Sequence, residues 1–468
     1  MKLYFFNFYQ FDINKLFCEF SFIYICINCI HFVFYFILLF IFIPIFTSHH
    51  IEKNNHPKDE VNIKLNQFIK FIKDLKDKGL LDGDVLIAKK GEILLHQSAY
   101  RSSFNDEKDT QFYIGSVSKQ FFAVALLKSL YDSSIEPTEE LKIADVKLKL
   151  NLPLSHFLPK NAAIWEGKMP AWAEEVTLHQ LLSHTSGIPN FTDSPGFRHL
   201  NRIDGNMLWF ESRRSSREII DLIIKEPLLF TPGSKFSYSN TGFVIIADVI
   251  EAITSQTVSQ YLQKNLFDPL ELTSTASPKN GKWEELKFIP KLFRLAPPMT
   301  FDLKGNQNHL YLVNRVEDIS TANGAGSIIS SVSDLLKWNQ ALHVDKKILP
   351  KELYHLFINP ILDDYAYGIG LENTESFGLV LGHTGGISSY RSFLFYIPEH
   401  EISIVVLSNV SFDFEKIEVD YRALSSQLGE TIRDEAECNQ TAFKMILQKY
   451  PISRGFDLIE EEFEKFLH

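Results

Sequence analysis

A serine and a lysine stand three residues apart at the start of a strongly apolar stretch. Ser116 and Lys119 follow a glycine within residues 112–127, and most of the residues after them are phenylalanine, alanine, valine or leucine. Such a run predicts a buried helix with Ser116 at its N-terminus, where residues three apart share one face. A serine hydroxyl becomes a nucleophile when a base lies beside it, so the pair is a candidate nucleophile with its base. The alternative is a helix-capping serine followed by a solvated lysine.

Two further short motifs follow in the order that a serine acyl-transferase needs. Tyr238-x-Asn240 lies between a Pro-Gly turn and a predicted helix, and His383-Thr384-Gly385 lies on a predicted strand. Each of the three motifs occurs once in the chain. The asparagine side chain offers both a hydrogen-bond donor and an acceptor to a substrate amide.

Together these motifs resemble the signature of the serine β-lactamase and penicillin-binding-protein superfamily. The likeness is to the class C β-lactamase branch, with its DD-peptidases, D-amino-acid amidases and esterases, and it covers about residues 68–410. The flanking segments 181–189, 238–242 and 382–386 also look like that branch's connecting motifs. The resemblance implies an α+β, β-lactamase/transpeptidase-like fold, in which an antiparallel sheet flanked by helices is joined to a mainly helical subdomain.

The resemblance also implies a role for each motif residue. Ser116 would be the nucleophile, and Lys119 and Tyr238 would share the work of base and proton donor in proportions that the sequence leaves open. The backbone N–H groups of Ser116 and Gly386 would form the oxyanion hole, where one donor is typically worth about 10²–10³ in rate. The residues expected to contact the substrate are Asn240, His383, Thr384 and Gly385.

Position 383 departs from the lysine that β-lactamases usually carry there. A histidine is only partly charged near neutral pH, whereas a lysine would be a permanent cation facing a substrate carboxylate. This difference favours a peptidase, amidase or esterase over an efficient β-lactamase. His184, in the segment Leu-Leu-Ser-His-Thr-Ser-Gly-Ile-Pro, is a second notable histidine. We interpret it as structural, because no acidic partner is fixed near it in the sequence; a catalytic role is the alternative.

The composition limits the other classes of function. The net charge of −11 argues against nucleic acid as the main partner. Of four cysteines, only Cys438 lies outside the apolar N-terminal region, which excludes a cysteine metal cluster or an internal disulfide in the remainder of the chain. No Walker A, Gly-x-Ser-x-Gly or His-Glu-x-x-His pattern is present. We therefore expect neither a metal nor another cofactor.

The N-terminal region is apolar enough to span a bilayer. Residues 20–47 contain no lysine, arginine, aspartate or glutamate, which predicts a membrane-anchoring signal segment within residues 1–50. A cleaved secretory signal is the alternative, because Thr47 and Ser48 are small. We expect the protein to be membrane-anchored with its body periplasmic or extracytoplasmic, or secreted if the segment is removed. Lysine counts on the two sides leave the orientation open.

The remaining chain divides into a catalytic domain, residues 51–415, and a helical C-terminal extension, residues 416–468. Residues 84–96 predict a β-hairpin and residues 365–410 an antiparallel meander, with mainly helical segments between them. Among those segments, 213–226 predicts a helix, 296–309 a loop, and 322–338 a glycine-rich turn before a helix capped near Ser333.

These features predict a serine hydrolase that forms an acyl-enzyme on a D-amino-acid peptide, an amide, an ester or a β-lactam. The alternative is a non-catalytic member of the same fold that binds peptidoglycan fragments or a protein partner.

Overall fold

The computed structural model describes most of the residues in the unit between Leu81 and Phe412. The described residues are 70, 73, 81–99, 109–194, 197, 214–278, 295–296, 299–302, 309–312, 322–374 and 378–412. The predicted N-terminal anchor and C-terminal helical extension lie outside them. The boundaries 51–415 for a catalytic domain therefore remain a prediction.

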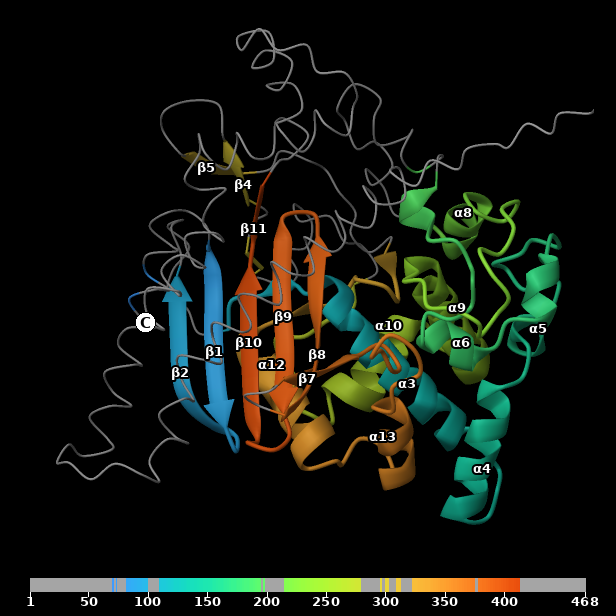
Figure 1. Cartoon of the computed structure of the whole chain (residues 1–468), viewed down its shortest axis with the longest axis horizontal. Helices are drawn as coiled ribbons and strands as arrows, with labels where there is room; N and C mark the ends of the chain where they lie inside the picture. Colours follow the sequence, from blue (N-terminus) through green and yellow to red (C-terminus); the bar gives the residue numbers. More distant parts are fainter. Residues whose placement is uncertain are drawn as a thin grey trace, which may run out of the picture. The chain divides into compact units, whose positions relative to one another are not determined.

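A six-stranded antiparallel sheet forms one layer of the unit (Figure 1). In spatial order its strands are β2 (Glu92–Ala99), β1 (Gly83–Lys89), β10 (Ile402–Ser408), β9 (Tyr390–Ile397), β8 (Gly378–Ile387) and β7 (Gly370–Thr374). The sequence correctly predicted both the early hairpin and the late meander. Antiparallel pairing of β1 with β10 joins them, so strands from the two ends of the unit share one sheet.

The hairpin turn shows why these residues form a hairpin. Lys90 and Gly91 both have positive φ, +53° and +78°, which is the backbone of a tight two-residue turn. Lys89 consequently pairs with Glu92, and this pairing sets the register of β1 against β2.

The other strands among the described residues form two smaller sheets. One has the order β11 (Val410–Phe412), β4 (Met299–Asp302) and β5 (His309–Leu312), and the other pairs β3 (Phe112–Tyr113) with β6 (Ile329–Ser330). β4 and the first residue of β5 fall within the segment 296–309 that the sequence predicted to be a loop. β4 forms because it pairs with both β5 and the end of the meander, a long-range contact that local composition does not reveal.

Helices lie between the hairpin and the meander along the chain, as expected, and form the helical region seen beside the sheet (Figure 1). The α-helices are α3 (Ser118–Asp132), α4 (Glu139–Leu150), α5 (Leu154–Phe157), α6 (Leu178–Leu182), α8 (Ser216–Asp221), α9 (Asn240–Thr254), α10 (Val258–Leu262), α12 (Val332–Asn339) and α13 (Lys351–Phe357). α8 is shorter than the helix predicted at 213–226. α12 is capped by Ser331, whose hydroxyl accepts the Asp334 N–H, rather than near Ser333.

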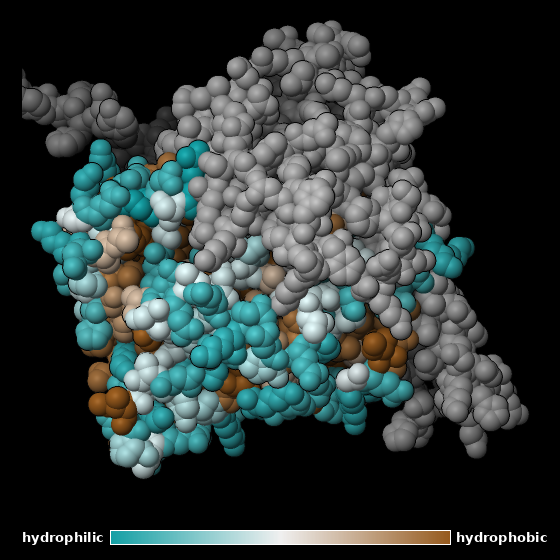
Figure 2. All heavy atoms as spheres, turned by 180° about the vertical axis from the view of Figure 1, so that it is seen from behind, coloured by the Kyte–Doolittle hydropathy of each residue, from teal (hydrophilic) through white to brown (hydrophobic). Residues whose placement is uncertain are grey.

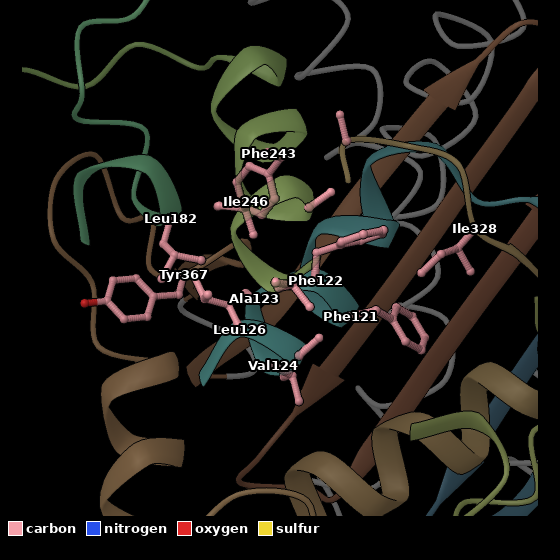
Figure 3. Close-up of a cluster of buried hydrophobic side chains, with 14 of the residues drawn as sticks. Phe121, Phe122, Ala123, Val124, Leu126, Leu182, Phe243, Ile246, Ile328 and Tyr367 are labelled. Atoms are coloured by element: carbon pink, nitrogen blue, oxygen red, sulfur yellow. The ribbon is translucent and has the colours of Figure 1, made fainter. Parts of the chain in front are cut away.

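Helix α3 is the centre of the hydrophobic core. From Ser118 to Leu127 every residue is buried, and Figure 3 shows its side chains meeting Leu182, Phe243 and Tyr367 from other segments. On another side Phe121 stacks on Trp338 of α12, with ring centroids 3.8 Å apart. Because the helix is enclosed all round, the position of its first turn is fixed by the whole core.

The face turned away from the view of Figure 1 is mostly hydrophilic in its described part, with apolar residues in small groups (Figure 2). Among the described residues, no single helix is long and apolar enough to cross a bilayer. The two helical segments Asn240–Thr254 and Val258–Phe267 together have the length and composition of a membrane span, but they are bent by 75° relative to each other.

Two adjacent glycines of β8 should respond differently to alanine. A Cβ on Gly385 would overlap the Ile114 carbonyl oxygen and the Ser392 hydroxyl, whereas on Gly386 its nearest neighbour would be Arg391 Nη1 at 3.6 Å. We expect Gly385→Ala to lower the free energy of unfolding by roughly 1–3 kcal/mol, as overpacking does. Gly386→Ala should change it by less than about 0.5 kcal/mol. Urea titration of both variants measures this, and equal losses would contradict the geometry.

Candidate active site

A short 3-10 turn before α3 holds Ser116 against strand β8. Ser116 lies in a short 3-10 turn, η1 (Gly115–Val117), that leads directly into α3. Gly115 has φ +49°, and a Cβ there would come within 2.8 Å of the Gly386 backbone nitrogen. The side-chain hydroxyl of Ser392 on β9 donates to the Ile114 carbonyl at 2.7 Å. Glycine and this hydrogen bond thus allow the nucleophile's turn to approach the sheet closely.

Lys119 connects three segments of the chain. Its Nζ lies 3.0 Å from Ser116 Oγ, 2.8 Å from Asn240 Oδ1 and 2.8 Å from the Ala325 carbonyl oxygen. The carbonyl and the amide oxygen can only accept hydrogen bonds, while the serine hydroxyl can also donate. An uncharged amine therefore satisfies all three contacts by donating to the two acceptors and accepting the Ser116 proton. That is the arrangement of a general base with its nucleophile.

The surroundings of Lys119 favour this uncharged form. The residue is fully buried, and its burial lowers the pKa of the amine well below its usual range. Within the described part of the chain, no carboxylate forms an ion pair with Nζ. The rings of Tyr238 and Phe243 lie 4.8 and 5.5 Å from it instead.

Tyr238 stands beside the Ser–Lys pair with its hydroxyl enclosed. Burial raises the pKa of the phenol above its usual range, and the neighbouring Ser116 hydroxyl offsets this only in part. Although the residue as a whole keeps some exposed surface, its oxygen is inaccessible and has no hydrogen bond of ordinary geometry among the described side chains. The phenol therefore remains protonated and can serve as a proton donor.

Asn240 is the first residue of α9, which explains its fixed position. Its side-chain oxygen accepts from Lys119, and its backbone N–H donates to Asn190 Oδ1 at 3.1 Å. Asn190 in turn donates to Thr192 Oγ1 and to Asp193 Oδ2, at 2.7 and 2.9 Å. Asn190 could not be predicted from the sequence, because nothing local shows that it satisfies the N-terminus of a helix fifty residues later.

His383 lies in the site in an uncharged form. Its Nδ1–H donates to the Thr384 carbonyl oxygen, so Nε2 accepts from the Tyr365 hydroxyl at 2.9 Å. Burial is the main cause that lowers the pKa of His383 to about 3, and a proton on the neighbouring Lys119 would disfavour a charge on the ring further. The ring keeps some exposed surface, but both nitrogens are engaged in the pattern of a neutral imidazole. This differs from the partial charge expected from the sequence, because packing against Tyr365 and Lys119 is invisible there.

The strand β8 presents the third motif on two faces. Thr384 and Gly386 point to one side and His383 and Gly385 to the other, since side chains alternate along a strand. Because Gly115 contacts Gly386, the backbones at Ser116 and Gly386 lie close together. The structure thus gathers seven of the eight residues that the sequence proposed: Ser116, Lys119, Tyr238, Asn240, His383, Gly385 and Gly386. The eighth, Thr384, has its side chain on the face of β8 opposite His383.

Three residues of the site were not predicted from the sequence, or were given a lesser role there. The Ala325 carbonyl takes a hydrogen bond from Lys119, Tyr365 holds His383, and His184 packs on Tyr238 at 4.2 Å between ring centroids. For Ala325, the glycine-rich turn at 322–327 was the available signal. Among the described residues, no group of three or more His, Cys, Asp or Glu is placed to hold a metal ion.

Comparison with known proteins places this geometry in context. A sequence model of the Beta-lactamase family matches residues 68–427. The chain is 25% identical over 362 residues to Penicillin-binding protein 4* of Bacillus subtilis (strain 168), which covers 73% of this chain and 71% of that protein. It is 23% identical over 356 residues to Protein flp of Staphylococcus aureus (strain MRSA252), covering 73% of this chain and 62% of that protein. The chain therefore spans roughly two thirds of the length of these relatives.

A solved structure is similar as well. The D-stereospecific amidohydrolase from Streptomyces sp. superimposes with a TM-score of 0.59 at 23% sequence identity, covering 73% of this chain and 93% of that chain. At this identity the likeness is one of fold. Together with the family match, it confirms the predicted antiparallel sheet with flanking helices.

Replacing the buried amine should remove the base. Lys119→Arg puts a permanent cation where an uncharged amine is needed, and Lys119→Met keeps the length without any amine. Both should lower kcat/KM for an activated ester by about 10²–10⁴, the usual contribution of general base catalysis. Lys147→Arg, on the exposed side of α4, is the matched control and should leave kcat/KM unchanged. Retention of activity in Lys119→Met would exclude Lys119 as the base.

The pH dependence should show no titration of His383. Because its pKa lies near 3, the ring carries no charge between about pH 5 and pH 8. The ratio of kcat/KM for a carboxylate-bearing substrate to that for a matched neutral ester should then be flat across this range, since the dependence on Lys119 cancels. A ratio that falls as the pH rises through about 6.5 would show that an imidazolium binds the carboxylate.

Proposed function

Because the chain belongs to the Beta-lactamase family, we propose that it is a serine hydrolase whose acyl-enzyme forms on Ser116. The observation that carries this proposal is the fully buried Lys119 amine, 3.0 Å from the Ser116 hydroxyl and satisfied as an uncharged base by Asn240 and Ala325. Burying an amine is costly, and no ion pair compensates it among the described residues. A structural serine would not require such an arrangement.

The proposed reaction begins with transfer of the Ser116 proton to Lys119. Ser116 Oγ then bonds to the substrate carbonyl carbon, and the negative charge that develops on the carbonyl oxygen is met by the N–H groups of Ser116 and Gly386. Tyr238, still protonated, donates to the leaving amine or alcohol and is reprotonated from Lys119. Water then attacks the ester, giving up a proton along the same path and releasing the acid and the free serine.

The substrate class we propose is an amide, an ester or a D-amino-acid-containing peptide, with β-lactams as poorer substrates. Support for this order comes from the neutral state of His383, which is held by the Tyr365 hydroxyl and offers no cation to a carboxylate. The D-stereospecific amidohydrolase from Streptomyces sp. shares the fold, which is compatible with amide chemistry in this framework.

Covalent labelling tests the nucleophile directly. The wild-type chain should react with a fluorophosphonate probe, which phosphonylates an activated serine. It should react more slowly with a fluorescent penicillin, which acylates the same serine. Ser116→Ala should lose both labels, while Ser129→Ala, a buried serine further along α3, should keep them. Labelling that survives in Ser116→Ala would refute the mechanism. An unlabelled wild type of normal stability would instead favour the non-catalytic, peptidoglycan- or partner-binding alternative.

The same labelled protein reports on location. Residues 20–47 carry no ionisable Lys, Arg, Asp or Glu side chain, and we propose that they anchor the chain in a membrane. In fractionated cells the labelled band should stay with membranes after alkaline carbonate washing. A labelled band in the medium would show that the segment is cleaved, and release by carbonate would contradict an anchor.

A further inference from the structure

His184 contacts three consecutive residues of the loop that carries Tyr238. Its backbone carbonyl accepts the Ser237 N–H at 2.9 Å, and its ring atom Nδ1 accepts the Ser239 N–H at 3.2 Å. Between these two hydrogen bonds the imidazole lies against the Tyr238 ring, with centroids 4.2 Å apart and planes tilted by 41°. The N–H groups of both residues beside Tyr238, and the Tyr238 ring, are therefore held by one residue.

The backbone of His184 makes this threefold contact feasible. It has φ +56°, in the left-handed region, which turns the carbonyl and the side chain toward the same segment. Histidine is among the few residues other than glycine that enter this region with some frequency, along with asparagine and aspartate. The next residue extends the hold, since the Thr185 carbonyl accepts the Gly233 N–H at 2.7 Å.

The ring is enclosed and uncharged. His184 is 1% exposed, and Phe243 and Tyr365 surround it at 5.3 and 4.9 Å. Since Nδ1 accepts from Ser239, the proton of the neutral ring is on Nε2. Burial is the main reason that the pKa of His184 lies well below its usual range, and a proton on Lys119 or His383 would lower it further. A protonated ring would lose the Ser239 hydrogen bond.

Tyr238 depends on this support because its own polar contacts are few. Its hydroxyl has no hydrogen bond of ordinary geometry among the described side chains. Lys119 Nζ lies 4.8 Å from the centre of the Tyr238 ring, and the rings of His383 and Tyr365 lie 6.1 and 6.3 Å from it between centroids. A phenol that must transfer a proton has to be held to a fraction of an ångström, and a displacement of about 1 Å can cost about 10²-fold in rate.

We propose that His184 is a positioning residue that fixes the Tyr238 phenol beside Ser116 through the Ser237 and Ser239 amides and through its own ring. The proposal rests on the proposed function of Ser116, Lys119 and Tyr238. It assigns a role in catalysis to a residue that touches neither the substrate nor the nucleophile, and it separates that role into a hydrogen-bond part and a ring-packing part.

Three substitutions separate the two parts. His184→Asn keeps a side-chain acceptor for the Ser239 N–H and tolerates the left-handed backbone, but lacks the ring face. His184→Phe keeps a ring against Tyr238 without an acceptor, and His184→Ala removes both. On a neutral activated ester, His184→Ala should lower kcat by about 10- to 100-fold with KM changed by less than about threefold. His184→Asn should recover part of this loss.

A double-mutant cycle with Tyr238→Phe decides whether the effect passes through Tyr238. If it does, His184→Ala should cost less than about threefold in kcat when Tyr238 is already Phe, because the group being positioned is gone. Equal losses in both backgrounds would overturn the proposal and leave His184 with a packing role. If His184→Ala does not fold, the same cycle with His184→Asn gives the answer by the same criterion.

Two controls complete the experiment. His343 is also a buried histidine stacked on an aromatic ring, that of Tyr396, in a separate part of the core. His343→Ala should lower the Tm while leaving kcat and the Tyr238 cycle unaffected; a matching kcat loss there would show that any buried histidine has this effect and would overturn the proposal. Activity that persists in Ser116→Ala would refute the proposed function itself, a failure distinct from an additive cycle in a Ser116-dependent enzyme.

Discussion

The burial of one amine determines how the site is built. Lys119 is fully enclosed at the first turn of α3. Its amine forms hydrogen bonds with the Ser116 hydroxyl, with the Asn240 side chain at the start of α9 and with the Ala325 carbonyl. An unpaired polar group in such a place would cost several kcal/mol, so these contacts must all be present in the folded state. The close packing extends to the lysine's own backbone: Gly368 has φ +68°, and a Cβ there would lie 2.7 Å from the Lys119 carbonyl oxygen.

The same burial makes the histidines of the site neutral. His383 and His184 approach Lys119 from different segments, and low solvation together with the neighbouring amine disfavours a proton on either ring. Each ring then uses one nitrogen as an acceptor, His383 for the Tyr365 hydroxyl and His184 for the Ser239 amide. The result is a site whose hydrogen-bond directions are fixed by neutral tautomers.

The sequence predicted the parts of this arrangement that are local. The apolar run after Ser116 gave the buried helix α3, the Lys90-Gly91 turn gave the hairpin, and three separate motifs gave the residues that meet. It did not predict contacts made by backbone atoms of distant segments, such as the Ala325 carbonyl and the Asn240 N–H, because any residue type can supply them. The protonation state of His383 also could not be predicted from the sequence, because a pKa depends on burial and on neighbours brought close by the fold.

Holding these groups uncharged has a consequence for catalysis. A cation beside the nucleophile would stabilise the developing oxyanion but could not remove the serine proton. A neutral amine can remove that proton but does not stabilise the oxyanion with a charge. In the proposed reaction, a neutral Lys119 leaves the oxyanion to the backbone dipoles at Ser116 and Gly386, and dipoles that are already oriented stabilise such a charge without reorganisation. The close approach of Gly115 to Gly386 and the Ser392 hydrogen bond to the Ile114 carbonyl hold these two segments together. In the proposed reaction, the buried lysine and strand β8 therefore complement each other: the uncharged base leaves the oxyanion to the N–H group of Ser116, in the turn before α3, and to that of Gly386, on β8.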